Sequence, residues 1–333
     1  MALLLRHDDV AAAVDMRDAI EAMEFAFAEE GCGGVHQPPR LNMPAGKPGK
    51  TFLRIGPCVM QQAGWMGFKA MNLAENFGAR FQIHLYSLAD GELRAIMDGH
   101  LITTLRTGAT SAVATKRLAR KEPGRVAVLG AGREAFMQLE AMRVLGLVAS
   151  ARVYSPTPSS REAFAGYFRN TLGMDIAAAT SAKAAVDGAT LVVAAVASSE
   201  PVLMGEWLAP GTHVNSVGTA RPILREVDPE VFRRSAILAV DTREGVFSEA
   251  GDCVAVKDWL RPEQAIQLSE LVADDSKGRS SDEQITLFKS VGSAVQDIAL
   301  AIRVYQNAMS RGLGQEVGVF PIASEKKFPK LRH

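Results

Sequence analysis

The chain has 333 residues, with 37 Lys and Arg against 37 Asp and Glu, and 47% of its residues are hydrophobic. This length suggests two domains, each large enough to bury its own core, and the balanced charge argues against nucleic acid as a partner. Three cysteines with no histidine at metal-ligand spacing argue against a disulfide framework or a metal site, and they favour a reduced, cytoplasmic compartment. No apolar run reaches the length of a membrane span and the opening residues are too few for a signal peptide, so we expect a globular protein without a membrane partner.

The first hundred residues predict a helix followed by a mostly antiparallel sheet. Residues 15–31 form the helix, because Asp15 is a suitable N-cap and apolar residues then recur on one face. The stretch 35–67 is rich in Pro and Gly, which predicts loops and short strands. Apolar and polar residues alternate over 81–86, and an Asp-Gly turn leads into a second strand at 92–97, so these segments form a hairpin.

The middle of the chain has the rhythm of a doubly wound parallel sheet. After a helix over 100–120, short apolar runs alternate with helix-length segments. These expected strands are residues 125–129, 151–154, 176–178, 190–196, 213–217 and 237–240. The chain then predicts a long helix over 282–308, interrupted at Gly292, and an irregular tail over 312–333. The fold class is therefore α/β.

A glycine turn follows the first of these strands and opens a helix. It is Gly130-Ala131-Gly132-Arg133-Glu134-Ala135. The first glycine permits a tight turn, the second lets the backbone approach a pyrophosphate, and the small alanine permits close packing of helix on strand. The helix N-terminus adds free amides and the positive end of the helix dipole. The flanking elements favour a dinucleotide site over a structural turn.

The choice of dinucleotide depends on the end of the second strand. An NAD-binding domain usually carries Asp or Glu there, where the acid accepts hydrogen bonds from the ribose. Here the chain runs from Tyr154 to Arg161 without an acid, through Ser155 and Thr157. Hydroxyl groups and a guanidinium suit a 2′-phosphate, which favours NADP over NAD. A capped turn that opens the next helix is the structural alternative, and NAD stays open.

Seven separated strings resemble the ornithine cyclodeaminase/μ-crystallin family. They are GFK at 67–69, MDG at 97–99, LRTGATS at 105–111, GAG at 130–132, HVNSVG at 213–218, REVD at 225–228 and FKSVG at 288–292. The resemblance implies a homodimer with a central Rossmann domain, residues 119–292. It also implies an α+β dimerisation and substrate domain, formed by residues 1–118 and by the C-terminal helix within residues 293–333.

The resemblance also implies a substrate site. Arg40, Lys69 and Arg106 match positions where family members hold the α-carboxylate of the substrate, and Gly292 is a further expected substrate-binding residue. The residues support this, because 41–68 contains no Asp or Glu and cations are the natural partners of a small anion. A guanidinium in the middle of an apolar helix, as at Arg106, needs an anion nearby.

Two residues are expected to be catalytic. Asp228 matches an acid that faces the substrate nitrogen in the family, where its charge favours the protonated iminium; by itself, followed by Pro229, it is also a good helix N-cap. Lys69 lies among cations that lower its pKa, so it can exchange the proton or polarise the substrate. The implied cofactor positions are Thr107, Gly130, Ala131, Gly132, Arg133, Glu134, Ser155, Thr157, Arg161, Ser198, Val217 and Gly218.

These residues predict an NAD(P)-dependent oxidoreductase that reduces a small α-imino acid to the amino acid, or runs the reverse reaction, by hydride transfer at the α-carbon. A cyclodeaminase that releases ammonia with catalytic NAD is the first alternative; it is disfavoured because 54–68 lacks the acid that such enzymes carry there. A non-catalytic, crystallin-like binding protein is the second alternative, disfavoured because such a protein needs no proton donor. A substrate with a second carboxylate, held by Arg54, is a less favoured option.

Overall fold

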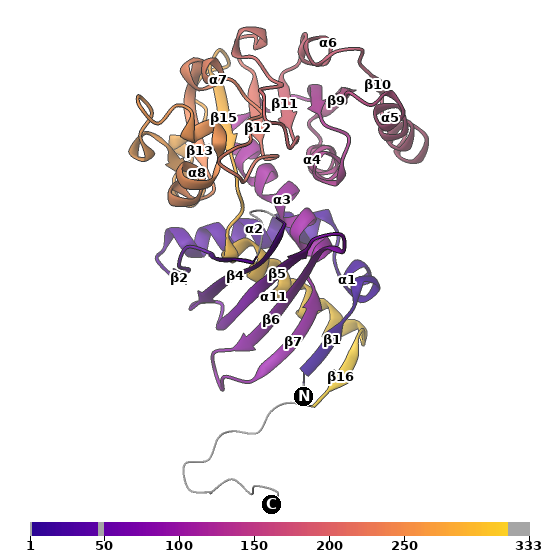
Figure 1. Cartoon of the computed structure of the whole chain (residues 1–333), viewed down its shortest axis with the longest axis vertical. Coiled ribbons are helices and arrows are strands. Elements are labelled where there is room, and N and C mark those ends of the chain that lie inside the picture. The colour runs from indigo at the N-terminus through magenta and orange to yellow at the C-terminus, as the bar shows by residue number, and fades with distance from the viewer. Residues whose placement is uncertain (1, 46–49, 319–333) are drawn as a thin grey trace, which may run out of the picture.

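The computed structural model describes residues 2–45 and 50–318, which form two sheets joined by a long helix (Figure 1). The first sheet has the order β16-β1-β7-β6-β5-β4-β2, with β3 paired to β4. Its strands are β1 (Ala2–Leu5), β2 (Val35–His36), β3 (Leu41–Ala45), β4 (Thr51–Met60), β5 (Trp65–Ala74), β6 (Gly78–Ser87), β7 (Leu93–Asp98) and β16 (Gln315–Val317). All pairs are antiparallel except β1 with β7, and β6 with β7 is the predicted hairpin.

The strand β4 is longer than the sequence predicted for this Pro- and Gly-rich stretch. One edge of β4 pairs with β5 from Phe52 to Met60. On the other edge, β3 covers residues 51–55 and β2 covers 59–60. Pro57 falls between these two segments, so no strand on that edge requires the amide proton that proline lacks. A single long strand is therefore compatible with this composition.

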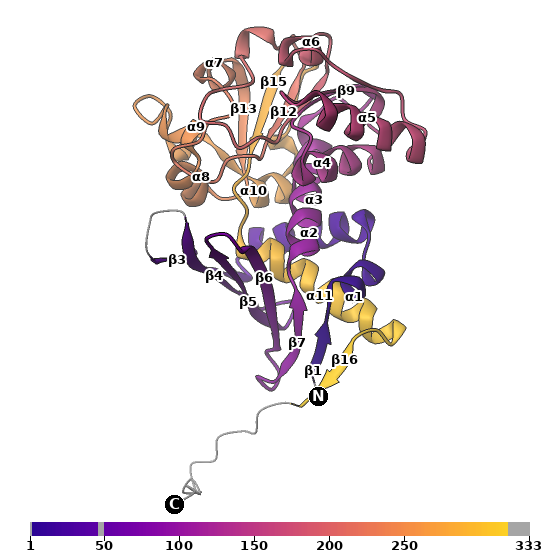
Figure 2. The ribbon, with the colours of Figure 1, turned by 45° about the vertical axis from the view of Figure 1, so that its right-hand side comes forward.

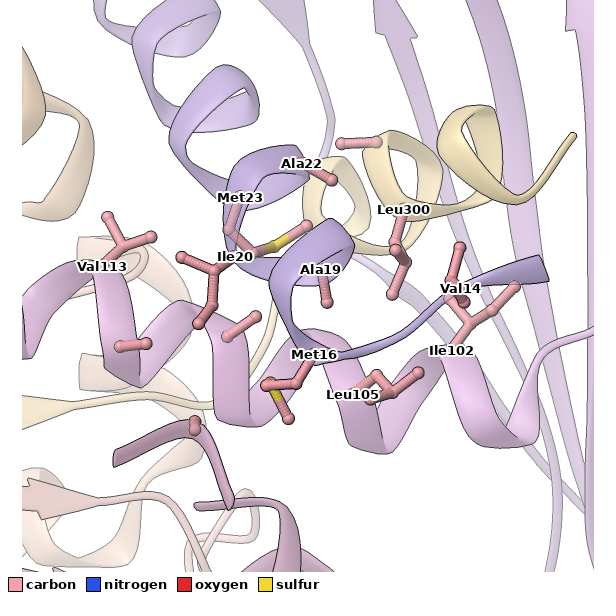
Figure 3. Packing of buried hydrophobic residues seen from close by; sticks show 14 of the residues in the cluster. Val14, Met16, Ala19, Ile20, Ala22, Met23, Ile102, Leu105, Val113 and Leu300 are labelled. Atoms are coloured by element: carbon pink, nitrogen blue, oxygen red, sulfur yellow. The ribbon is translucent and has the colours of Figure 1, made fainter. Parts of the chain in front are cut away.

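Three helices build the core next to the first sheet. They are α2 (Met16–Gly31), α3 (His100–Leu118) and α11 (Ala294–Arg311). As predicted, Asp15 caps α2, and its carboxylate accepts hydrogen bonds from the amides of Arg17 and Asp18 at 2.8 and 3.0 Å. Ile20 of α2 packs against α3, and Leu300 of α11 lies next to α2 (Figure 3). Each such buried side chain stabilises the fold by about 1.5–3 kcal/mol.

The second sheet is entirely parallel, with the order β10-β9-β8-β11-β12-β15-β13-β14. Its strands are β8 (Gly124–Leu129), β9 (Val148–Tyr154), β10 (Ile176–Ala178), β11 (Leu191–Ala194), β12 (His213–Ser216), β13 (Ser235–Val240), β14 (Ile266–Gln267) and β15 (Ile285–Lys289). The strand order reverses between β8 and β11, and ligands of such sheets bind beyond the carboxyl ends of the strands at this point. The predicted α/β fold class is confirmed.

The remaining helices are short or connect the strands of the second sheet. They are α1 (His7–Ala13), α4 (Arg133–Val144), α5 (Pro158–Leu172), α6 (Ala182–Val186), α7 (Pro229–Arg234), α8 (Arg243–Glu249), α9 (Gly251–Val254), α10 (Leu268–Ala273) and the 3₁₀ helices η1 (Gly205–Trp207), η2 (Pro262–Gln264) and η3 (Asp275–Lys277). Among the described residues, no helix combines the length and the apolar character needed to cross a lipid bilayer.

The prediction of one long helix over 282–308 is wrong. Residues 285–289 form β15, a fully buried strand between β12 and β13, and α11 begins only at Ala294. Gly292 turns the chain between them with φ +82°, a conformation that favours glycine. A short apolar run looks the same in a buried strand and in a buried helix. Of the predicted irregular tail, residues 315–317 form β16 and residues 319–333 lie outside the described part.

The two sheets are connected where the candidate site lies. The helix α3 contacts β6 of the first sheet and β12 and β15 of the second (Figure 2). The turn after β15 leads into α11, which packs on β4, β5 and β6. Residues on α3 and in the turn between β15 and α11 therefore lie close to both sheets. The domain bounds predicted at 118/119 and 292/293 stay a prediction.

Candidate active site

A cavity of about 240 Å³ lies where the first sheet, α3 and α11 meet α8. It is smaller than the pockets that take drug-sized ligands, so it suits a small metabolite. Arg40, Lys69, Arg106 and Gly292 line it, and the structure thus brings together the four residues predicted to bind substrate. The cavity also reaches the carboxyl edge of the second sheet, because Thr242, which closely follows β13, lines it.

Lys69 and Arg106 share one carboxylate at the floor of this cavity. Lys69 Nζ lies 2.6 Å from Asp297 Oδ2, and Arg106 Nε donates to Asp297 Oδ1 at 3.1 Å. Burial lowers the pKa of Lys69 to about 8; Asp297 opposes this shift and Arg106 adds to it. Burial alone would raise the pKa of Asp297, but Lys69 and Arg106 outweigh it and hold that pKa below its ordinary value. The cluster therefore combines two cations with a shared carboxylate, and one of these cations, Lys69, has a pKa of about 8.

The guanidinium of Arg106 is fixed from three sides. Its Nη1 donates to Gln296 Oε1 at 2.7 Å. Gln296 Nε2 in turn donates to Asp241 at 3.1 Å, and the same carboxylate accepts the amide of Gly292 at 2.6 Å. A Cβ atom on Gly292 would overlap the Arg106 guanidinium. The glycine at the turn before α11 is therefore required for the position of Arg106.

Arg40, directly before β3, connects the first sheet to α8. Its Nε and Nη2 donate to the two carboxylate oxygens of Glu249, on α8, at 3.0 and 2.8 Å. Nη2 also donates to the Val291 carbonyl at 3.0 Å. Arg40 is thus already paired, so a carboxylate that bound at this position would share the arginine with Glu249 or displace it.

The structure does not bring Asp228 to this cavity. Its carboxylate caps α7, where Oδ1 accepts the amides of Gly205 at 2.9 Å and Val231 at 3.1 Å, and Asp228 is not among the lining residues. The cap agrees with the local sequence, because an acid followed by Pro229 is an ideal start for a helix. The predicted contact of Asp228 with the substrate nitrogen stays a prediction.

Sequence reasoning missed the acids that hold the cations. Asp297, Asp241 and Glu249 were not singled out, although Asp297 has a signal like that of Arg106. It lies in the first turn of an amphipathic helix, in which Val295 and Ile298 are buried, and a buried charge implies a partner. The partners of Asp241 and Glu249 are distant in sequence and leave no local pattern.

The glycine turn fits a dinucleotide phosphate. Gly130 adopts φ +115°, and a Cβ there would overlap the carbonyl of Ala195. Gly132 is the N-cap of α4, which has no side-chain cap, and nothing in the described residues lies within 4 Å of where its Cβ would be. No side chain of the described residues caps the first amides of α4, so they are available to an anion.

The other predicted cofactor residues lie near the carboxyl ends of the strands of the second sheet. Thr107 follows Arg106 on α3, and its carbonyl accepts from Gln138 of α4 at 3.1 Å. Arg161 Nη1 donates to the Ser155 carbonyl at 2.9 Å and the guanidinium lies over the Tyr154 ring. The others are Ala131, Arg133 and Glu134 at the start of α4, Thr157 as the N-cap of α5, Ser198 after β11, and Val217 and Gly218 after β12.

A doubly wound parallel sheet with an uncapped glycine turn, adjoining a small cationic cavity, defines the Rossmann-type class of α/β proteins. The model of the ornithine cyclodeaminase/mu-crystallin family matches residues 2–312. The chain belongs to this family, which confirms the resemblance found in its sequence.

Individual relatives are similar over nearly the whole chain. Ketimine reductase mu-crystallin of Mus musculus is 33% identical over 86% of this chain and 90% of its own length. The structure of Thermococcus litoralis Δ(1)-pyrroline-2-carboxylate reductase, in complex with NADH and L-proline, is 34% identical, with a TM-score of 0.89 over 95% of this chain and 100% of that one. An archaeal alanine dehydrogenase dimer with bound NAD is 29% identical, with a TM-score of 0.88 over 97% and 99%.

Proposed function

We propose that this protein is an NAD(P)-dependent oxidoreductase that interconverts a small α-imino acid and the corresponding α-amino acid. The observation that carries the proposal is the Lys69–Asp297–Arg106 cluster, in a small cavity that reaches the carboxyl edge of a dinucleotide-type sheet. The relatives named above are two reductases of cyclic imines or ketimines and one amino-acid dehydrogenase, which are the two directions of one reaction.

The residues of the cavity divide the chemistry between binding and proton transfer. Arg106 and Arg40 bind the α-carboxylate, and Arg106 adds a planar guanidinium that Asp297 and Gln296 hold in place. Lys69 Nζ gives a proton to the substrate nitrogen in the reductive direction and takes it back in the oxidative one. When bound, the nicotinamide supplies or accepts the hydride at the α-carbon. Since Asp228 caps α7, Lys69 is the one proton donor that we assign.

The cofactor is held by the glycine turn and by the turn after β9. Gly130, Gly132 and the free amides of α4 take the pyrophosphate. Arg161 lies beside Ser155 without an ion pair to any residue of the described segments, so it is available for a 2′-phosphate. We therefore favour NADP, although relatives bind NAD or NADH.

The active form that we propose is a homodimer in the cytoplasm. The face of the first sheet that points away from α11 is apolar, with Pro57, Val59, Met66, Phe68 and Tyr86 along one groove. A second copy of the chain would cover this face, and the related alanine dehydrogenase is a dimer. The three free cysteines agree with a reduced compartment.

Reduced-nicotinamide absorbance, measured with purified protein, tests the function. The panel is 2-oxo acids with ammonia or methylamine, cyclic imines and ornithine, each with NADH and NADPH. Net oxidation of the cofactor with an imine supports the proposal. Ammonia release from ornithine without net redox change supports a cyclodeaminase, and inertness with every substrate supports a binding protein.

A further inference from the structure

The cations that line the cavity are not equally neutralised. Arg40 pairs with Glu249 at 2.8 Å, and Lys69 and Arg106 share Asp297. Arg54 also lines the cavity, yet within residues 2–45 and 50–318 it forms no ion pair. Its Nε donates to Asn42 Oδ1 at 2.5 Å and its guanidinium lies over the Phe52 ring. The undescribed residues 46–49 contain no acid.

The surroundings of Arg54 make this lack of a partner costly. Burial lowers its pKa, Arg40 and Arg221 lower it further, and Glu249 opposes them. A half-buried guanidinium next to other cations gains more from an incoming anion than a solvated one, because less water competes for it. Among the lining arginines, Arg54 is therefore the position with unused capacity for a carboxylate.

The register of the sheet fixes where Arg54 lies relative to the proposed α-carboxylate site. In the antiparallel pair β4–β5, Gly56 is opposite Lys69 and Arg54 is opposite Met71. Arg54 and Lys69 are therefore diagonal neighbours, and both line the same cavity. Such neighbours have Cα atoms about 7–8 Å apart, within reach of long side chains. Gly56, opposite Lys69, also lines the cavity, so no side chain of β4 separates Arg54 from Lys69 along this face.

We propose that Arg54 binds a second, distal carboxylate of the substrate, so that the preferred substrates are α-imino dicarboxylates. This inference rests on the proposed function and specifies its substrate class. The α-carboxylate lies on Arg106 and Arg40, and one or two methylene groups separate the α-carbon from the carboxylate on Arg54. The reaction stays balanced, because the imine carbon takes a hydride from the reduced dinucleotide and its nitrogen takes the proton of Lys69, which solvent replaces.

A matched substrate pair tests the assignment. 2-Oxoglutarate and 2-oxopentanoate, each with ammonia, differ only in a terminal carboxylate against a methyl group. We expect wild-type kcat/KM to favour the dicarboxylate about tenfold or more, since charge-assisted hydrogen bonds are strong. Arg54→Gln removes most of this preference and leaves 2-oxopentanoate nearly unchanged, while Arg54→Lys keeps part of it. Lys50→Gln, which removes a charge next to β4 outside the cavity, changes neither substrate.

Three results would overturn the assignment. Equal losses for both substrates in Arg54→Gln would mean that Arg54 holds the α-carboxylate, and no loss for either would remove it from the site. A wild-type enzyme that prefers 2-oxopentanoate would exclude the substrate class. Calorimetric binding of L-glutamate against L-norvaline, in wild type and Arg54→Gln, separates this inference from the proposed function. If the protein reduces no imine, the proposed function is wrong. The difference in binding between L-glutamate and L-norvaline then still decides the role of Arg54.

Discussion

Burial determines what Lys69 can do, because it brings the pKa of this ammonium to about 8. The protonated form is the acid in imine reduction, and the neutral form is the base in amino-acid oxidation. We expect kcat/KM for reduction to be level below pH 8 and to fall about tenfold per pH unit above it, while the oxidative rate rises through the same range. Lys69→Met should abolish this transition, and a flat profile in the wild type between pH 6 and 9.5 would contradict the role.

Gly292 controls the position of Arg106 through the space that it leaves empty. In Gly292→Ala the new methyl group overlaps the Arg106 guanidinium, so the arginine moves and we expect KM for the imino acid to rise about tenfold or more. Gly173→Ala is the matched control, because its φ is also positive, at +65°, and its Cβ would have open space. Both variants lose stability through backbone strain. Only the first should change KM, and equal KM values would contradict the packing argument.

The cofactor preference depends on Arg161. Because its guanidinium lies beside Ser155 at the end of β9, we expect Arg161→Ala to weaken NADPH about tenfold or more and NADH little, as followed by nucleotide fluorescence. Arg152→Ala is a suitable control, since that arginine belongs to the same strand but bonds to the Ala184 carbonyl. A similar loss for both nucleotides would refute contact with a 2′-phosphate.

At the scale of elements, β15 carries a buried charge cluster into the second sheet. Lys289 Nζ lies 2.6 Å from Asp252 and 3.2 Å from Glu226, and all three side chains are fully buried or nearly so. Glu226 also accepts the amides of Val196 and Gly218, so the cluster holds the loops after β11 and β12. These loops carry three of the predicted cofactor positions, Ser198, Val217 and Gly218.

Replacing Lys289 should therefore destabilise the loops after β11 and β12. Lys289→Met leaves two buried carboxylates without their cation, and we expect the free energy of unfolding to fall by about 3–5 kcal/mol, measured by urea denaturation. Lys50→Met, in an exposed pair with Glu75 at 3.5 Å, should change it little. A loss for Lys289→Met no larger than this control would show that the cluster does not stabilise the loops.

At the scale of the whole molecule, the uncovered face of the first sheet is the feature that one chain leaves unsatisfied. Phe68 stacks on His84 there, with ring centroids 4.7 Å apart. We expect Phe68→Asp to convert dimers to monomers in sedimentation velocity, because it buries a charge in the proposed interface. Leu172→Asp, at an exposed position on α5, should leave the dimer intact. A wild-type monomer at high concentration would contradict the assembly.

Much of the fold was predictable because its signals are local. The capping residue Asp15, the hairpin turn and the strand–glycine–helix sequence at Gly130 each occupy a few consecutive residues. The strand at 285–289 was not predictable in the same way. Its apolar run fits a helix or a strand, and only its position between β12 and β13 decides between them.

The sequence by itself determined the α/β class, the glycine turn and the set of cations, because propensity, turn geometry and charge depend on neighbouring residues. Only the tertiary structure decided which acids meet those cations. Asp297 lies 191 residues from Arg106, and Glu249 lies 209 residues from Arg40, so no local pattern links them. The tertiary structure also leaves Arg54 without an ion pair to any described residue, although Glu249 and Asp297 line the same cavity. Ion pairs across such separations form only when the two sheets pack together.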